Sequence, residues 1–397
     1  MTLQERHLIF SKLLTCVPDT HGGRIHFFQT IKNIKYNLGT MAKVVITNAT
    51  VFDGNSLQEN ITVTIENGLI SSINSSADTS NATIIDGRGQ TLLPGFIDAH
   101  VHLDNDAEIA ARLLSQLAKA GVTTALDMGY FSGAVRNSLT NHPGIAELHI
   151  AGNFASATGS LHSRITKASL IDSPESAVRF VEDRVAEGAD YIKIVADVPG
   201  PSQEVINTLV YEARRHGKLT VAHAASSKAF PMAQEGKVDI ITHVPLDVPL
   251  DEASARLMKE EGRACVPTLV MAETIANAKV LPGLMYEAAK ESVAQLHKAG
   301  VPILVGTDAN QSTMASVKHG ESLHQELKLL IDAGFSTEDA LRSCTSLTAK
   351  LFRLENRGEI AVGKRADLVL VDGNPLQDIT ATEKVKRVWI AGKEVEL

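Results

Sequence analysis

The stretch "PGFIDAHVHL", residues 94–103, places two histidines one residue apart at the end of an apolar run. Side chains two residues apart on a β-strand point to the same face, so His100 and His102 share a face with Asp98. Two exposed histidines on an alternating strand are the ordinary interpretation of an isolated His-x-His pattern. Whether this pair does chemistry depends on what the rest of the fold brings beside it.

The chain between Pro94 and Cys344 alternates short apolar runs with amphipathic stretches such as "EIAARLLSQLAKAG". The apolar runs are "FIDAHVH", "VTTALDM", "ELHIAGN", "YIKIVAD", "LTVAHA", "VDIITHV", "RACVPTLV" and "PILVGTD". Eight strand–helix alternations in about 250 residues predict an α/β fold, a (β/α)8 barrel of the TIM type. A doubly wound open sheet is the alternative, but no GxGxxG sequence follows the early strands to support it.

The two ends of the chain have a different, period-two pattern. In "ITVTIENGLISSI", residues 61–73, Asn67-Gly68 is a strong hairpin signal, and near the other end "ADLVLVDG" starts at Ala366. Each fragment is too small to bury a core alone, so we predict that they complete one β-sandwich together. The predicted domains are residues 41–93 and 351–397 for the sandwich and 94–350 for the barrel.

The first forty residues precede this pattern as an extension. They contain five basic residues, three histidines and only two acidic residues, without an apolar segment suited to secretion. A mitochondrial targeting peptide would be more basic, so we interpret residues 1–40 as a flexible extension and keep targeting as the alternative. We expect a chain that starts at Met41 to fold and to keep its activity.

Composition excludes several classes of partner. The chain is 44% hydrophobic and 21% charged, as in ordinary globular proteins, and its net charge of −8 argues against nucleic-acid binding. No apolar run is long enough to span a membrane. The odd, widely separated Cys16, Cys265 and Cys344 fit neither a disulfide framework nor a thiolate metal cluster, and agree with a reducing, cytoplasmic compartment. We expect a small-molecule ligand, and homo-oligomer formation stays open.

Four more apolar runs end in potential metal ligands. These are Lys193, His223, His243 and Asp308. Each has an ordinary structural interpretation alone, as a hydrogen-bonded histidine, a helix cap or a lysine reaching water. In a barrel, however, the strand ends meet around one cavity. Four imidazoles and a carboxylate suit zinc, with manganese, nickel or iron as substitutes, and their number favours two ions over one.

Longer motifs carry a resemblance to a known family. The segments "LLPGFIDAHVHL", "GADYIKIVAD", "GTDAN" and "RGEIAVGKRADLVLVDGNPLQDI" resemble the amidohydrolase superfamily, and the likeness covers nearly all of Met41–Leu397. The similarity is to the branch of imidazolonepropionases, Xaa-Pro and Xaa-Arg dipeptidases and ochratoxin-degrading amidases. It implies a binuclear hydrolase that cleaves an amide C–N bond of an N-acyl amino acid or a dipeptide-like molecule with a metal-bridging hydroxide.

The resemblance also implies a role for each ligand. His100 and His102 would bind one ion and His223 and His243 the other, with Lys193 bridging them as a carbamate formed from carbon dioxide. An unmodified ammonium between two cations would be repelled, which agrees with this modification. Asp308 would contact the first ion and transfer the proton of the hydroxide to the leaving nitrogen.

Two further residues have open roles. His162, in "SATGSLHSRI", lies where relatives carry a Gly-Gly-His loop near the substrate, but Ser160-Leu161 replaces the glycines here. A substrate contact and a loop histidine therefore both remain open for His162. Asp98 either orients a ligand histidine from outside the ligand set or makes a purely structural hydrogen bond. At helical spacing, we expect His324 to pack or face solvent.

Three rival functions were weighed. A deaminase of this fold needs a glutamate where this chain has Ser226, so deamination is disfavoured. A non-catalytic barrel homologue would have lost ligands, whereas all six are present. Hydrolysis of a cyclic amide or a urea-like bond remains the alternative, because the loops carry no arginine pair that would select a carboxylate. The sequence "ITHVPLD" also departs from the usual Glu-His-Gly at Thr242 and Val244, which predicts a changed pocket wall.

Overall fold

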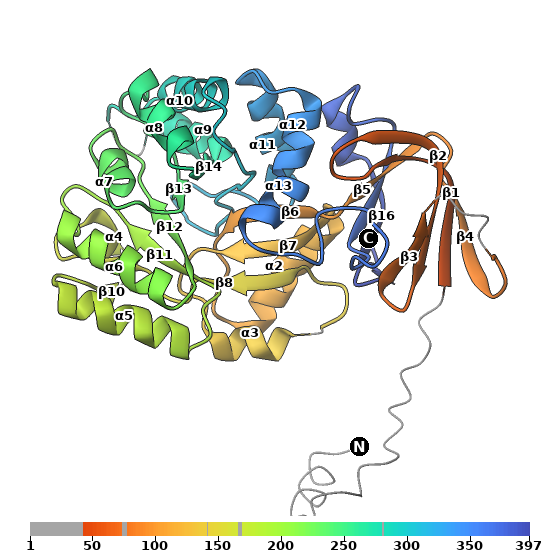
Figure 1. Cartoon of the computed structure of the whole chain (residues 1–397), viewed down its shortest axis with the longest axis horizontal. Helices are drawn as coiled ribbons and strands as arrows, with labels where there is room; N and C mark the ends of the chain where they lie inside the picture. Colours follow the sequence, from red (N-terminus) through yellow and green to blue (C-terminus); the bar gives the residue numbers. More distant parts are fainter. Residues whose placement is uncertain (1–42, 74–77, 141, 166–168, 280–281) are drawn as a thin grey trace, which may run out of the picture. The chain divides into compact units, whose positions relative to one another are not determined.

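The computed structural model describes residues 43–73, 78–140, 142–165, 169–279 and 282–397 (Figure 1). The predicted extension, residues 1–40, lies outside the described residues. Among the described residues, no helix has the length and apolarity needed to cross a bilayer.

Two parallel sheets form the middle of the chain. The first is β6 (Phe96–Val101), β7 (Val122–Asp127) and β8 (Glu147–Ile150). The second runs in the order β10-β9-β11-β12-β13-β14, with bounds Ser169–Leu170, Ala155–Ser156, Tyr191–Val195, Leu219–His223, Ile240–Thr242 and Ala264–Val266. Most of these strands are buried throughout, as expected for parallel strands covered on both faces. The fold is therefore α/β with parallel sheets.

Amphipathic helices separate these strands (Figure 1). Their bounds are α2 Ala107–Lys119, α3 Gly133–Leu139, α4 Leu161–Ile165, α5 Pro174–Ala186, α6 Gln203–Arg215, α7 Ala229–Glu235, α8 Glu252–Glu260, α9 Leu269–Ala278, α10 Tyr286–Lys298, α11 Glu321–Asp332, α12 Thr337–Ser343 and α13 Ser346–Leu351. In α2, the Asp106 side chain caps the first turn, and Leu113, Leu114 and Leu117 turn toward the core.

The predicted strand "PILVGTD" is not a regular strand. Residues 302–309 make isolated bridges only, from Ile303 to Cys265 and from Ala309 to Val101. The ladder is interrupted because the Val305 N–H donates to the Ser343 carbonyl and the Thr307 N–H donates to a side chain. The segment still bonds to both sheets: the Leu304 N–H donates to Cys265 O at 2.8 Å and the Ala99 N–H to Val305 O at 2.9 Å.

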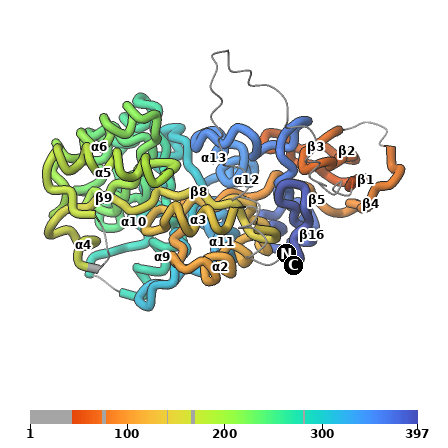
Figure 2. Tube along the Cα trace, turned by 90° about the horizontal axis from the view of Figure 1, so that it is seen from below, coloured from red at the N-terminus to blue at the C-terminus, as the bar shows by residue number. Residues whose placement is uncertain are grey.

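Strands from both chain ends share a third sheet. It contains β1 (Lys43–Phe52), β2 (Leu57–Glu66), β3 (Leu69–Ile73), β4 (Ala82–Asp86), β5 (Gln90–Pro94), β15 (Leu368–Asp372), β16 (Val385–Ile390) and β17 (Lys393–Glu394). β15 pairs antiparallel with β5, so segments far apart in sequence lie side by side (Figure 2). The eight strands are hydrogen-bonded into one sheet rather than into two separate sheets of a sandwich.

Candidate metal centre

His100, His102 and Asp308 come together at the carboxyl end of β6. The Nε2 atoms of the two histidines are 3.3 Å apart, and Asp308 Oδ1 lies 3.4 Å from His100 Nε2 and 3.1 Å from His102 Nε2. Three ligand atoms about 2.0–2.2 Å from one tetrahedral ion are roughly 3.3–3.6 Å apart. Asp308 has a φ of 56°, a left-handed conformation that aspartate tolerates. The three donors have the spacing of ligands around one cation.

His243 and His223 extend this cluster from the neighbouring strands β13 and β12. The His243 ring stacks on His100 with centroids 5.0 Å apart, and the His223 and His243 centroids are 4.7 Å apart. Asp308 Oδ2 lies 3.9 Å from His243 Nε2. The structure thus brings the second predicted pair of histidines beside the first.

The buried imidazoles are in the form that binds metals. Burial lowers the pKa of His100, His223 and His243 well below the ordinary value, and the charges of neighbouring basic groups lower it further. These rings are therefore neutral near pH 7, as a metal-ligating imidazole must be.

Lys193 lies on β11 in the same cluster. Its side chain is buried, and its Nζ makes no hydrogen bond within the described part of the chain. Burial lowers the lysine pKa to about 7, against the opposing charges of Asp308 and Asp127. A neutral amine carries the lone pair needed for reaction with carbon dioxide. The orphaned nitrogen is thus compatible with the predicted carbamate.

Two threonine hydroxyls contact imidazole rings of the cluster. Thr242 Oγ1 lies 2.8 Å from His100 Nδ1, and Thr268 Oγ1 contacts His243 Nδ1. Holding Nδ1 from outside leaves Nε2 directed to the centre, the usual arrangement around ligating histidines. Sequence reasoning treated Thr242 only as a departure in the pocket wall and missed Thr268.

Glu326 of α11 binds the backbone directly after Thr268. Its carboxylate accepts hydrogen bonds from the backbone N–H groups of Leu269 at 2.9 Å and Val270 at 2.7 Å, directly after Thr268. Thr268 itself has a φ of 52°, uncommon for a β-branched residue. Burial raises the Glu326 pKa to about 8. The sequence gives no signal for this contact, since Glu326 occupies an ordinary helical position.

Asp98 contacts Thr307 and the His100 backbone rather than an imidazole ring. Its carboxylate accepts from Thr307 N at 3.0 Å, Thr307 Oγ1 at 2.7 Å and His100 N at 3.2 Å. Burial raises its pKa to about 7. Asp98 therefore ties β6 to the segment that carries Asp308, while Thr242 holds the His100 ring.

His162 and a residue that sequence reasoning missed, Asp197, lie at the other side of the cluster. His162 Nδ1 is 2.8 Å from Asp197 Oδ2, and the His162 and His223 ring centroids are 4.3 Å apart. His162, Asp197 and His223 are close enough to form a second group of potential metal ligands. Asp197 comes four residues after Lys193, on the same side of the extended chain, and this spacing could have indicated it.

The two late histidines are outside the cluster of ligand atoms. His324 is buried, packs edge-on against Phe96 and has its Nδ1 3.1 Å from Thr382 Oγ1. His319 Nε2 lies 3.1 Å from the His102 carbonyl oxygen. The expectation that His324 packs rather than binds metal agrees with these contacts.

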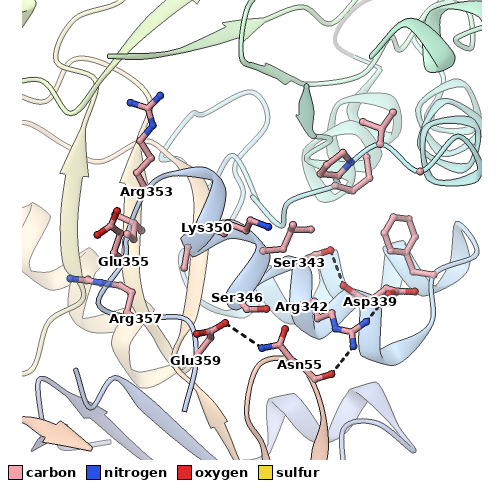
Figure 3. Close-up of a pocket in the computed structure, with 18 of the residues that line it drawn as sticks. Asn55, Asp339, Arg342, Ser343, Ser346, Lys350, Arg353, Glu355, Arg357 and Glu359 are labelled. Atoms are coloured by element: carbon pink, nitrogen blue, oxygen red, sulfur yellow. Dashed lines mark hydrogen bonds and ion pairs between the residues drawn. The ribbon is translucent and has the colours of Figure 1, made fainter. Parts of the chain in front are cut away.

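A cavity of about 700 Å³ lies away from these residues, among α12, α13 and the start of the 302–309 segment (Figure 3). Some of its charged and polar lining residues have protein partners: Arg342 donates to Asn55 O at 2.6 Å and contacts the neighbouring Glu338. Asn55 in turn donates to Glu359 at 3.2 Å. The ligand-like residues described above do not line this cavity.

The chain is similar to several known proteins. A model of the amidohydrolase family matches residues 91–395. The chain is 25% identical to an imidazolonepropionase of Streptomyces griseus over 79% of this chain and 86% of that protein, and 26% identical to the ochratoxinase of Aspergillus niger over 86% and 84%. A solved Xaa-Pro dipeptidase with bound methionine in its active site superposes with a TM-score of 0.78, at 27% identity over 89% of this chain and all of that one.

The family match covers most of the chain and contains every residue of the histidine cluster. The hydrolases among its relatives agree with hydrolysis of amide bonds as the general activity. This chain belongs to the amidohydrolase family.

Proposed function

We propose that this protein is a binuclear metal-dependent amidohydrolase that cleaves the amide C–N bond of a small N-acyl amino acid or dipeptide-like molecule. The observation that carries the proposal is the mutual spacing of His100, His102 and Asp308, 3.1–3.4 Å between donor atoms, which suits ligands of one ion. His223, His243 and a carboxylated Lys193 would complete the second site.

The proposal includes a closed (β/α)8 barrel. Residues 302–309 bond to β14 on one side and to β6 on the other. On the opposite side, the Asp190 N–H donates to Ile150 O at 2.8 Å, linking the end of β8 to the start of β11. These contacts would join the two parallel sheets into one ring, whose strand ends carry the ligands.

Two divalent ions, most suitably zinc, fit the neutral imidazoles and the carboxylate. When bound, such ions lower the pKa of a shared water and polarise the scissile carbonyl. The chain's own residues supply the remaining steps. Asp308 accepts the proton of the attacking water and delivers it to the leaving nitrogen, which a group touching both metal-binding histidines is placed to do.

Substrate would bind beside His162, which faces the cluster through its contact with His223. The names of the relatives support two substrate classes. The dipeptidase and the ochratoxinase favour a linear amide, while the imidazolonepropionase supports the alternative, a cyclic amide or urea-like bond. Deamination is disfavoured further, because the Ser226 hydroxyl accepts a hydrogen bond from the Ala229 N–H at the start of α7.

Metal analysis combined with a substrate panel tests the proposal. The protein should contain two divalent ions per chain, and it should hydrolyse members of the N-acyl amino acid and dipeptide classes in a panel that also contains lactams and ureas. Turnover of lactams or ureas alone would favour the alternative substrate class. Hydrolysis that survives complete removal of metal would contradict the proposed chemistry.

A further inference from the structure

Asp197 has a set of contacts that the proposed function does not use. Besides the 2.8 Å contact with His162 Nδ1, its Oδ2 accepts a hydrogen bond from Ser160 Oγ and lies 3.4 Å from the His162 N–H. Its Oδ1 lies 3.8 Å from His223 Nε2. Three donors from the His162 loop thus converge on one carboxylate at the end of β11.

The Asp197 carboxylate determines which ring nitrogen of a neutral His162 carries the proton. An ionised carboxylate can only accept, so the proton of a neutral His162 must be on Nδ1, and the ring's lone pair is then on Nε2. The 2.8 Å contact with Asp197 Oδ2 constrains the orientation of the His162 ring at Nδ1.

Ser160 explains a departure noted in the sequence. It replaces a glycine of the relatives' loop, it is fully buried, and its hydroxyl donates to Asp197. The hydroxyl points to the carboxylate rather than to an imidazole, so the trio is not a nucleophilic serine arrangement. Ser160 and Asp197 instead act together as a clamp on His162.

We propose that Asp197 is a positioning residue which, with Ser160, holds His162 in the Nδ1-protonated tautomer and presents Nε2 to the substrate. This inference rests on the proposed function, because it places substrate at the histidine cluster. A role for Asp197 and His162 as joint ligands of one ion fits less well. Their 2.8 Å separation is a hydrogen-bond distance, shorter than the roughly 3.3 Å between ligands of one ion.

A double-mutant cycle tests the coupling. Asp197→Ala and His162→Ala should each lower kcat/KM about 10- to 100-fold, the usual effect of removing an orienting partner. The double variant should be no slower than His162→Ala, since Asp197 acts through that ring. All three should retain the metal content of the wild type. Independent, multiplying losses, or loss of one ion per chain in Asp197→Ala, would overturn the inference.

Asp172→Asn is the matched control. The Asp172 carboxylate binds the same loop through Thr158, whose N–H and Oγ1 donate to it at 2.8 and 2.7 Å, without contacting His162. This variant should keep wild-type kcat/KM. A loss equal to that of Asp197→Ala would show that loop anchoring, not orientation of the ring, explains the effect, and would overturn the proposal.

A spectroscopic readout separates this inference from the proposed function. In 15N-histidine NMR, the His162 signals are those missing from the His162→Gln spectrum. We expect the Nδ1–H pattern in the wild type and its loss in Asp197→Ala. An Nε2–H pattern in an active enzyme would overturn the inference and leave the hydrolase proposal intact. An Nδ1–H pattern in a protein without hydrolase activity would support the clamp and count against the proposed function.

Discussion

Buried polar and charged side chains have different partners at the two ends of the parallel strands. At the carboxyl ends, Lys193 has no hydrogen-bond partner in the described structure. Asp308 lies 3.1–3.9 Å from Nε2 of His100, His102 and His243, and Asp197 lies 3.8 Å from Nε2 of His223. At the amino ends, beside the cavity of Figure 3, Arg357 donates to Glu147 at 2.8 Å and to Thr124 at 2.9 Å, with Asp367 at 3.7 Å.

The difference bears on the proposal that the carboxyl ends bind an external ligand. Buried polar groups are normally satisfied inside the protein, and a buried ion pair keeps its partners. A buried donor without a hydrogen-bond partner destabilises the folded protein unless an external ligand binds it. The buried Lys193 amine without a hydrogen-bond partner, beside several imidazoles, supports the proposal that the carboxyl ends form the functional face.

The largest expected effect is at Asp308. Asp308→Asn keeps the shape of the side chain but cannot take up a proton, so kcat should fall about 100- to 10,000-fold. Steady-state kinetics on the best substrate of the panel measures this. The control is Asp339→Asn in the cavity of Figure 3, which should retain wild-type kcat. Equal losses of kcat in the two variants would contradict the assignment of catalysis to the carboxyl ends.

A substitution at the cavity end should change the stability of the protein rather than its activity. Arg357→Met leaves the nearly inaccessible Asp367 carboxylate with one cationic partner fewer, and should lower the free energy of unfolding by about 3 kcal/mol. Denaturant titration gives this value, and kcat of the folded variant should equal that of the wild type. A variant of unchanged stability but reduced kcat would reverse the roles assigned to the two ends.

A smaller effect is expected at Thr242. Thr242→Val removes the hydroxyl that holds His100 Nδ1 and should weaken metal affinity or activity about 10- to 100-fold. Competition with a chelator of known affinity measures the change. Thr274→Val is the control, because the Thr274 hydroxyl donates to the Val270 carbonyl within α9. If both variants bind metal as the wild type does, Thr242 has no orienting role.

The sequence predicted which side chains come together better than it predicted the residues that hold them in place. His100, His102, His223, His243 and Asp308 lie at or near the ends of apolar runs, and Lys193 lies within one, in the middle of β11. The partners Thr242, Thr268, Glu326 and Asp197 were missed, because each contact depends on which elements become neighbours in space. Thr242 is 142 residues from His100, and no periodicity encodes that pairing.

The prediction of a regular eighth strand was wrong for a related reason. "PILVGTD" has the composition of a strand, yet Val305 and Thr307 give their N–H groups to Ser343 O and Asp98. Propensity describes how well a residue fits a ladder, and here a side-chain carboxylate and the carbonyl at the end of α12 compete for the donors. The helices were easier to predict because their amphipathic pattern is local.

A further prediction concerns the pH dependence of stability. Burial raises the Glu326 pKa from 4.5 to about 8, so the folded state binds this proton more tightly than the unfolded state. The contribution of Glu326 to stability is therefore fully present below pH 4.5 and decreases as pH rises to about 8. The unfolding free energy of the wild type minus that of Glu326→Gln should decrease across this interval. A difference that stays constant from pH 5 to 8 would contradict the burial effect.

The central claim is that the donors at the carboxyl ends hold two divalent cations. Anomalous diffraction at the zinc edge, on crystals grown with zinc, tests it directly. The account predicts two peaks per chain, one within about 2.3 Å of His100 Nε2, His102 Nε2 and Asp308, and one equally close to the Nε2 atoms of His223 and His243. A map with no peak within bonding distance of these atoms, in a protein that still hydrolyses its substrate, would contradict it.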